Sequence, residues 1–568
     1  MASQASVHAP PVSPTPASTP APAQSPVHDF HTSLAKWSEW PMNLAARTAL
    51  MNPSTLRSYR SQLDAAEAEL LTDQESVVEV RFRDFQVDRK ALAKKNVHSE
   101  EKLRDWLGIV TKPSAANTTL NLVSTTKRDP KSRFIYIYAN HSRDRLRITR
   151  SMLTLILSFH QVMPEYLDFL QSFGLQTAAR DLYFSGFRRQ IALKKPPTGP
   201  DLNALGRSAQ QYQIAYNLKG VTEKSATEWS IRNAAIYHRY DVNSDRAVWI
   251  VTKGGSDLYD SYKELTDSGG RPEDRAFLSA DQCFLASLSP HLLFSRWSVH
   301  DWRGYLRWLE DKVEKDSLLG VLGPREPGQR PKRYQARDVQ HMQFWQERAS
   351  EAVVVLEGNI EVLMSLAQFY QGLAHDDRFP RRSCADDIAD FVSQLDTMIA
   401  DLRNDVNRAS ALVKTTADRK ELIIQHRQNE TEERMHRLNK NMKEETLVVR
   451  IITIVTLVYL PATFVSTLFS TDIIKYQDDK YPNGKFSETA MVRWIQVTVP
   501  LTALTLIAAG LGKWRASRGA EDEGEAIEPH DMPPPTGWRH RRKLLPWRWT
   551  GKQVTTPAMA FPMNSLPP

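Results

Sequence analysis

The chain has 568 residues, of which 25% are charged and 41% hydrophobic, values that are ordinary for a globular protein of two or three domains. Its two cysteines, Cys283 and Cys384, exclude a disulfide framework and a cysteine-based metal site. The net charge of +8 would suit nucleic acid, yet the sequence contains no zinc-finger, helix-turn-helix or aromatic ribonucleoprotein pattern. We therefore expect no nucleic-acid partner and attribute the positive charge to basic residues beside apolar segments.

The first half of the chain predicts a disordered arm followed by a soluble α+β domain. Residues 1–28 are rich in Pro, Ala and Ser and carry too little apolar surface to offset the entropy of ordering. Residues 29–274 mix both periodicities, with a core helix predicted at Ser151–Phe173 and a hairpin turn at Val242–Asp245. Alternating Val, Ile, Phe and Tyr predict strands at Ser76–Phe85, Arg133–Ala139, Gln211–Asn217, Glu228–Asp241 and Arg246–Thr252.

Residues 275–445 predict a region of long helices. Helical periodicity marks Arg275–Lys315 and Tyr334–His375, and a third helix begins near Ser383. No Gly or Pro occurs between Ala385 and Leu460, so we expect this helix to continue into the apolar segment that follows. A helix of about 86 residues far exceeds what a compact monomer needs. Its polar stretch, 425–445, predicts a coiled coil or a helix that lines a wet space.

Residues 446–512 predict a two-helix transmembrane domain. Residues 451–471 contain no charge, and 21 residues at about 1.5 Å each span roughly 31 Å, enough to cross a bilayer core. Residues 494–512 form a second uncharged segment of 19 residues, in which Pro500 and Gly510 are tolerable in a membrane helix. We expect a multi-pass membrane protein with lipid as its surroundings.

Hydroxyl side chains recur at heptad spacing along the first span, which is the period of helices packed around a common axis. Two explanations stay open. The hydroxyls line a water-filled path through several subunits, or they bond packed membrane helices to one another. Six of the eight heptad positions carry a hydroxyl, and the two sets are Thr446, Thr453, Leu460 and Thr467, and Val449, Thr456, Thr463 and Ser470.

Basic residues predict the topology. They precede the first span and follow the second, whereas the loop Asp472–Arg493 is balanced in charge, so both termini are expected on the cytosolic side, or the matrix side in a mitochondrion. The sequence does not identify the membrane. The tail, 513–568, is predicted to be mostly disordered. Its basic, Trp-rich part, 538–552, suits an anionic membrane surface or has no specific partner.

No motif indicates an enzyme. The sequence lacks a Walker lysine loop, HExxH and GxSxG, and no carboxylates have catalytic spacing, so we expect neither enzymatic activity nor an organic cofactor. His238 lies in a strand pattern and is predicted to be structural. Asp401 and Asp405, like Asp386 and Asp387, indicate a charged helix surface more readily than a cation site.

The first span resembles a known family. Residues 452–456 (ITIVT) followed by 460–464 (LPATF) are similar to the first membrane helix of the CorA-type magnesium channels, with its Pro-x-Thr-Phe element. The YHRYDV and WIVTKGG segments resemble fungal CorA-like membrane proteins. The resemblance implies an α+β cytosolic domain, a long-helix stalk, two C-terminal membrane helices and a homopentamer. It also implies that Leu460, Thr463 and Thr467 line the pore, and the hydroxyl pattern adds Thr453 and Thr456.

The chain departs from that family at one place. The family ends its first membrane helix with a Gly-Met-Asn signature, and the corresponding positions here are Ser470, Thr471 and Asp472. Five Asp472 carboxylates in a pentamer would attract a hydrated divalent cation, so Asp472 is the predicted metal-binding residue. The sequence thus predicts a passive channel for Mg²⁺ or a related divalent cation. The alternative is a non-conducting CorA-like membrane scaffold or regulator.

Overall fold

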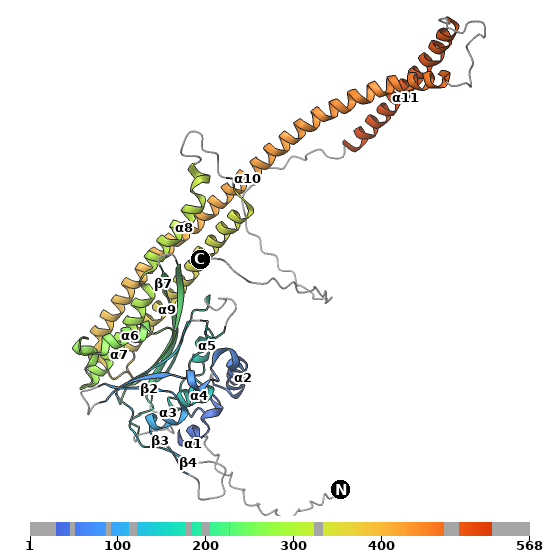
Figure 1. The fold of residues 1–568 in the computed structure, drawn as a ribbon. Coiled ribbons are helices and arrows are strands. Elements are labelled where there is room, and N and C mark those ends of the chain that lie inside the picture. The colour runs from blue at the N-terminus through green and yellow to red at the C-terminus, as the bar shows by residue number, and fades with distance from the viewer. Residues whose placement is uncertain are drawn as a thin grey trace, which may run out of the picture. The chain divides into compact units, whose positions relative to one another are not determined.

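The computed structural model describes residues 30–45, 51–86, 92–112, 122–141, 143–175, 183–194, 205–225, 228–322, 333–470 and 488–524. The chain divides into two compact units, residues 1–433 and 434–568 (Figure 1). The predicted arm, 1–28, and the basic, Trp-rich part of the tail lie outside the described residues. The finer division predicted from the sequence, with boundaries after residues 274 and 445, stays a prediction.

A seven-stranded sheet organises the first unit. The strand order is β2-β1-β5-β9-β8-β7-β6, and only β5 and β9 pair in parallel. A separate two-stranded sheet joins β3 to β4. The bounds are β1 Val80–Phe85, β2 Ala93–Val97, β3 Ile109–Lys112, β4 Leu122–Thr125, β5 Ser132–Ala139, β6 Phe187–Ala192, β7 Gln211–Ser225, β8 Glu228–Asp241 and β9 Arg246–Gly254.

The central strands are buried on both faces because their side chains alternate between two hydrophobic cores. In β5, Phe134 and Tyr136 enter one core, whereas Ile135 and Ile137 enter the other. All eight residues of β5 are buried. The sheet is therefore the middle layer of three, with helices on each side. This arrangement confirms the predicted α+β character of the soluble part.

Short helices cover one face of the sheet, and side chains fix their ends. The Asn52 side chain accepts a hydrogen bond from the Thr55 N–H at 2.8 Å at the start of α2, and Ser99 and Thr149 cap α3 and α4 in the same way. The bounds of these helices are α1 Phe30–Ala35, α2 Pro53–Leu70, α3 Glu100–Leu107, α4 Arg150–Phe159 and α5 Tyr166–Leu170.

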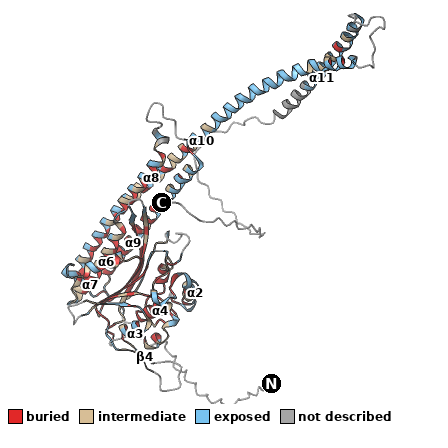
Figure 2. Cartoon of the chain, in the orientation of Figure 1, coloured by how far each residue is buried: buried red, intermediate tan, exposed pale blue. Residues whose placement is uncertain are grey.

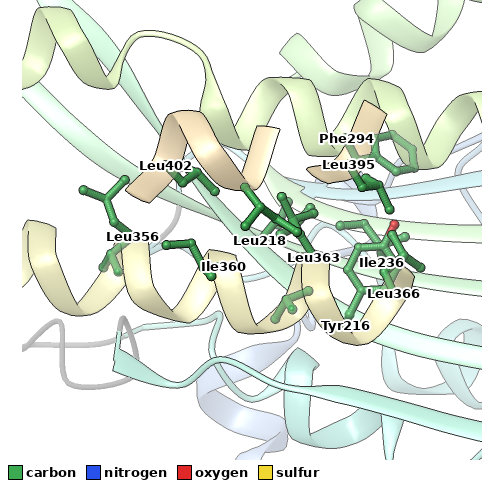
Figure 3. Packing of buried hydrophobic residues seen from close by; sticks show 14 of the residues in the cluster. Tyr216, Leu218, Ile236, Phe294, Leu356, Ile360, Leu363, Leu366, Leu395 and Leu402 are labelled. Atoms are coloured by element: carbon green, nitrogen blue, oxygen red, sulfur yellow. The ribbon is translucent and has the colours of Figure 1, made fainter. Parts of the chain in front are cut away.

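Longer helices cover the other face. Leucines from α9 and from the first half of α10, among them Leu363 and Leu395, pack with Leu218 and Ile236 of the sheet (Figure 3). A capping box between Ser279 and Gln282 begins α7. The bounds are α6 Asp257–Thr266, α7 Ala280–Val299, α8 Trp302–Leu322, α9 Ala336–Ala374 and α10 Ala385–Ser470.

The structure corrects the boundaries of four predicted elements. The strand predicted at Gln211–Asn217 extends to Ser225 as β7. The helix predicted at Ser151–Phe173 is two helices, α4 and α5. The ring of Pro164 disfavours helical geometry at the preceding residue, Met163, which lies between them. The helix predicted at Arg275–Lys315 is also two, separated at Asp301, which has a φ of 68°. The strand predicted from Ser76 begins only at Val80, since a 3₁₀ turn occupies Glu75–Val77. The hairpin at 242–245 is confirmed, with Asp241 paired to Arg246.

The second unit contains the rest of α10 and α11, Glu488–Gly524. Among the described residues, three helical segments are long and apolar enough to span a membrane: Ala336–Ala374, Arg382–Leu468 and Met491–Gly512. Burial separates them. In α9, 56% of the apolar stretch is buried within the protein, against 11% and 6% for the other two (Figure 2). More than half of the apolar stretch of α9 is therefore buried in the core, whereas most of the apolar stretch of the other two segments is exposed.

Candidate pore-lining helix

The predicted pore-lining residues lie on one face of α10, which we call the hydroxyl face. It comprises Thr453, Thr456, Leu460, Thr463, Thr467 and Ser470. All six are exposed in the single chain, and Leu460 keeps 64% of its surface accessible. The structure thus places the predicted residues on one side of one helix; their role in conduction stays a prediction.

Each hydroxyl on this face donates its hydrogen to the helix's own backbone. This back-bonding occupies the only hydroxyl hydrogen and leaves oxygen lone pairs directed away from the helix. The distances are 2.7 Å from Thr453 Oγ1 to Val449 O, 2.8 Å from Thr456 Oγ1 to Ile452 O, 3.0 Å from Thr463 Oγ1 to Tyr459 O, 2.8 Å from Thr467 Oγ1 to Thr463 O and 2.8 Å from Ser470 Oγ to Thr467 O. The face therefore presents a row of hydrogen-bond acceptors.

Helix α11 packs on the opposite side of α10. Pro461 and Val465 are buried there. The Trp494 indole N–H donates to Ser466 Oγ at 3.1 Å at the edge of this contact, because Ser466 lies roughly 120° around the helix from the centre of Pro461 and Val465. At about 100° per residue, Pro461 and Val465 are centred roughly 150° from the hydroxyl face. Within the described part of this unit, α11 consequently leaves the hydroxyl face uncovered.

Two of the three positions that replace the family signature are outside the described residues. Ser470 is the last residue of α10, with its hydroxyl bonded to Thr467 O. Thr471 and Asp472, the predicted metal-binding residue, fall in 471–487, which the structure does not describe. The described part of α10 therefore ends at the first of these three positions.

The carboxylates Asp401 and Asp405 lie in an open groove of about 1020 Å³ beside α7. Burial, reinforced by Asp401, raises the pKa of Asp405 although Arg408 opposes the shift. Three arginines line the same groove, and no group of three potential metal ligands occurs among the described residues. This arrangement agrees with a charged helix surface.

His238 has the structural role predicted for it. It is fully buried, stacks on Trp249 with ring centroids 3.9 Å apart, and shares a hydrogen bond with His291 at 3.1 Å. Tyr216 and Tyr370 contact the His291 ring nitrogens at 2.7 and 2.9 Å. Burial lowers the pKa of both histidines well below the usual value, so both are neutral.

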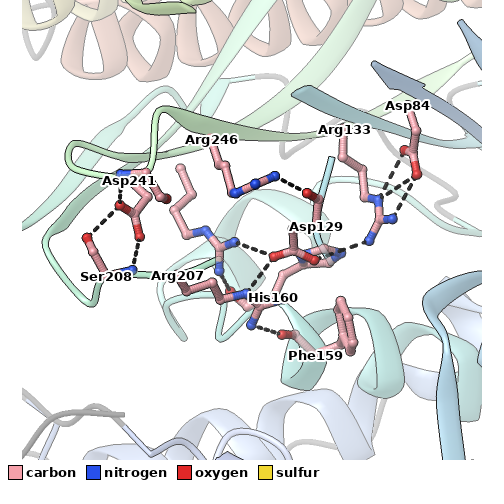
Figure 4. Close-up of polar contacts among 11 residues, drawn as sticks. Asp84, Asp129, Arg133, Phe159, His160, Arg207, Ser208, Asp241 and Arg246 are labelled. Atoms are coloured by element: carbon pink, nitrogen blue, oxygen red, sulfur yellow. Dashed lines mark hydrogen bonds and ion pairs between the residues drawn. The ribbon is translucent and has the colours of Figure 1, made fainter. Parts of the chain in front are cut away.

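Sequence reasoning missed a buried ionic network at the end of the sheet (Figure 4). Arg133 contacts both oxygens of Asp84, the shortest contact being 2.7 Å, and Arg207 Nε donates to Asp129 Oδ2 at 2.6 Å. Arg246 donates to the Asp129 carbonyl. The available signal was the charge inside strand patterns such as VRFRDF and SRFIYIYA. These patterns predict strands only, and the structure buries Arg83, Asp84 and Arg133.

Comparison with known proteins identifies the family. The profile of the family described as CorA-like transporters matches residues 32–319, half of the chain. The chain belongs to the CorA-like transporter family. The match covers the seven-stranded sheet, α7 and most of α8. The resemblance seen in the sequence rested mainly on residues 452–464, which lie outside this match. Members of this family are transporters rather than enzymes, as the sequence predicted.

Other comparisons add little. No curated protein matches the sequence. Among solved structures, the full-length CmaX protein is 11% identical, with 77% of this chain and 98% of that chain covered and a TM-score of 0.29. The ZntB cytoplasmic domain from Vibrio parahaemolyticus RIMD 2210633 is 8% identical, with 63% and 99% covered and a TM-score of 0.32. Neither likeness carries information about function at these TM-scores.

Proposed function

We propose that this CorA-like protein is a passive channel for a divalent cation, Mg²⁺ or a related ion, formed by a homopentamer. The first membrane helix, residues 451–471 of the predicted span, lines the pore with its hydroxyl face. The observation that carries the proposal is that α11 packs on the opposite side of α10, so the hydroxyl face is left for other copies of the chain. Membrane lipid surrounds the apolar remainder of both helices.

Hydrogen-bond polarity supports a hydrated cation as the permeant species. Mg²⁺ releases its waters reluctantly, and the hydrogens of those waters point outward from the ion. A wall of hydroxyl oxygens whose own hydrogens are bonded to backbone accepts these hydrogens without removing the water. Leu460 interrupts the row and would form the apolar constriction of the path.

At the end of the pore, we assign the role of the missing Gly-Met-Asn signature to Ser470, Thr471 and Asp472. A ring of Asp472 carboxylates would concentrate divalent cations and discriminate less by size than a neutral ring. The charge flanks place both termini in the cytosol or the matrix, with the 472–493 loop on the other side. The departure from the signature also favours a second candidate, a non-conducting scaffold or regulator that keeps the family's fold.

Ion flux into liposomes separates the two candidates. Purified full-length protein is reconstituted, and entry of Mg²⁺, Co²⁺, Ni²⁺ and Mn²⁺ is followed with a trapped indicator. We expect saturable entry of at least one of these ions. If none enters while the protein is inserted, the channel proposal is wrong and the scaffold is favoured.

Variants test the proposed wall. Thr463→Val with Thr467→Val removes two rings of acceptors and should lower flux by about tenfold, equivalent to roughly 1.4 kcal/mol. Thr502→Val on α11 is the matched control, because its hydroxyl also bonds its own backbone, at 2.7 Å. Asp472→Ala should lower flux and change selectivity. Equal effects of the wall and control variants would contradict the assignment, and a monomeric mass in detergent would contradict the pore.

A further inference from the structure

A basic groove lies on α10 directly before the first membrane span. It has a volume of about 740 Å³, and no carboxylate occurs among its described lining residues. Arg450, at its end, is the last charged residue before the apolar segment. The lining consists of His436, Asn439, Lys440, Met442, Lys443, Thr446, Leu447 and Arg450.

The cations of this groove lie away from the proposed pore. At about 100° per residue, Lys440, Lys443 and Arg450 are centred on the same side of α10 as Pro461 and Val465, the side on which α11 packs. The hydroxyl face is roughly 150° away. In an assembly built around the hydroxyl face, these three side chains therefore point outward, where a permeating cation does not pass.

Their height along the helix places them at the membrane boundary. Lys443 is eight residues before Ile451, or about 12 Å along the helix, and long basic side chains extend toward the headgroup layer from such positions. Leu447 adds apolar surface to the groove on the side nearer the span. A site in which apolar surface at Leu447 lies between the cations of Lys443 and Arg450 matches a lipid whose headgroup is anionic.

We propose that this groove binds the headgroups of anionic phospholipids in the leaflet next to Arg450. Lys and Arg provide charge-assisted hydrogen bonds to phosphate and carboxylate oxygens. Among the described residues, Lys440, Lys443 and Arg450 form no ion pair, although Glu444 lies one turn from Lys440. The inference rests on the membrane insertion included in the proposed function, and does not depend on ion conduction.

The test measures which lipids stay bound to the full-length protein. Protein in vesicles of phosphatidylcholine and phosphatidylserine, at about 4:1, is extracted in mild detergent, and retained lipids are counted by native mass spectrometry. We expect enrichment of phosphatidylserine. Lys440→Gln with Lys443→Gln should lower the enrichment by roughly fivefold per residue. The control, Arg434→Gln with Arg437→Gln, removes the same charge from a different side of the helix and should leave most of the phosphatidylserine enrichment.

Four results would overturn the proposal. Equal retention of the two lipids shows no headgroup preference, and equal losses in both double variants show general attraction rather than a site. Displacement of phosphatidylserine by inorganic phosphate shows a site for soluble anions. Failure to insert into the vesicles would contradict this site and the channel together, whereas loss of ion flux with lipid enrichment intact would contradict the channel alone.

Discussion

The two units of this protein differ in what they bury: the first buries charged groups in a bonded network, whereas the second leaves large apolar side chains exposed. In the first unit, Asp84, Asp129 and Arg133 are buried and bonded to one another or to neighbouring arginines. In the second unit, Ile451, Leu460 and Phe464 keep about 60% of their surface exposed. These charged groups of the first unit find opposite charges within one chain. The described part of the second unit exposes an apolar surface that no described residue covers.

This difference indicates where stability and function reside. A substitution in the buried ionic network of the first unit should lower the free energy of unfolding. The described hydrogen bonds of the exposed hydroxyl face stay within α10, so a substitution there should change what the assembled protein does. The units are therefore distinguished by whether a variant loses stability or activity.

The largest expected effect is in the buried network of the first unit. Although burial opposes it, the guanidiniums of Arg207 and Arg133 lower the pKa of Asp129, so this carboxylate is charged in the folded protein. Asp129→Asn removes the charge that these arginines surround and should cost about 3–5 kcal/mol of unfolding free energy. Thermal or denaturant unfolding of the purified protein measures the loss.

An exposed carboxylate provides the control for Asp129. The Asp105 side chain is 89% exposed, and its closest cation is Lys127 at 4.0 Å. Asp105→Asn should change stability by less than about 1 kcal/mol. If the two variants unfold alike, the buried network contributes nothing beyond ordinary surface charge.

The sequence predicted the strands but not this network. Periodicity located β5, β8 and β9 within two residues at each end, because alternation of large apolar side chains is a local property. The pairing of Asp84 with Arg133 joins strands 49 residues apart in the chain. Which charged positions of a strand become buried depends on its neighbours in the sheet, and no local pattern encodes this.

The second prediction concerns a buried lysine in the same unit. Lys219 is fully buried, and among the described residues its ammonium donates to two neutral acceptors, Phe184 O at 2.6 Å and Ser185 Oγ at 2.5 Å. Burial lowers the pKa of Lys219 to about 7. Because the unfolded lysine still holds its proton between pH 7 and its ordinary pKa near 10.5, stability should rise with pH from 7 upward, by about 1 kcal/mol per pH unit.

Melting temperatures between pH 7 and pH 8.5 test the Lys219 prediction. The wild-type curve contains the contribution of Lys219, and Lys219→Met should remove it, so the difference between the two proteins should change with pH. Lys224→Met, at a side chain 44% exposed and paired with Glu228, should leave the pH dependence unchanged. Parallel wild-type and Lys219→Met curves would show that this amine does not titrate in that range.

The candidate pore face was predictable from sequence for a different reason. Heptad spacing and helix geometry together fix which residues share a face, so Thr453, Thr463 and Thr467 needed no knowledge of distant contacts. The side on which α11 packs was not predictable, because a short apolar hairpin can pack on several faces of its partner helix. The side on which α11 packs distinguishes the two surfaces of α10: the proposed pore wall faces away from α11, and the basic groove at Lys440 and Lys443 lies on the same side as α11.

The smallest expected effect lies in the contact between α10 and α11. Ser466→Ala removes the acceptor of the Trp494 indole, and hydrogen bonds between membrane helices contribute about 0.6 kcal/mol on average. Ser470→Ala is the matched control, since that hydroxyl bonds only to its own helix. The red shift of Trp494 fluorescence relative to a Trp494→Phe background, with stability in detergent, measures the change. If Ser470→Ala alters both as much as Ser466→Ala does, the indole bond does not contribute to the contact between α10 and α11. The assignment of the hydroxyl face to other subunits would then rest on the burial of Pro461 and Val465 alone.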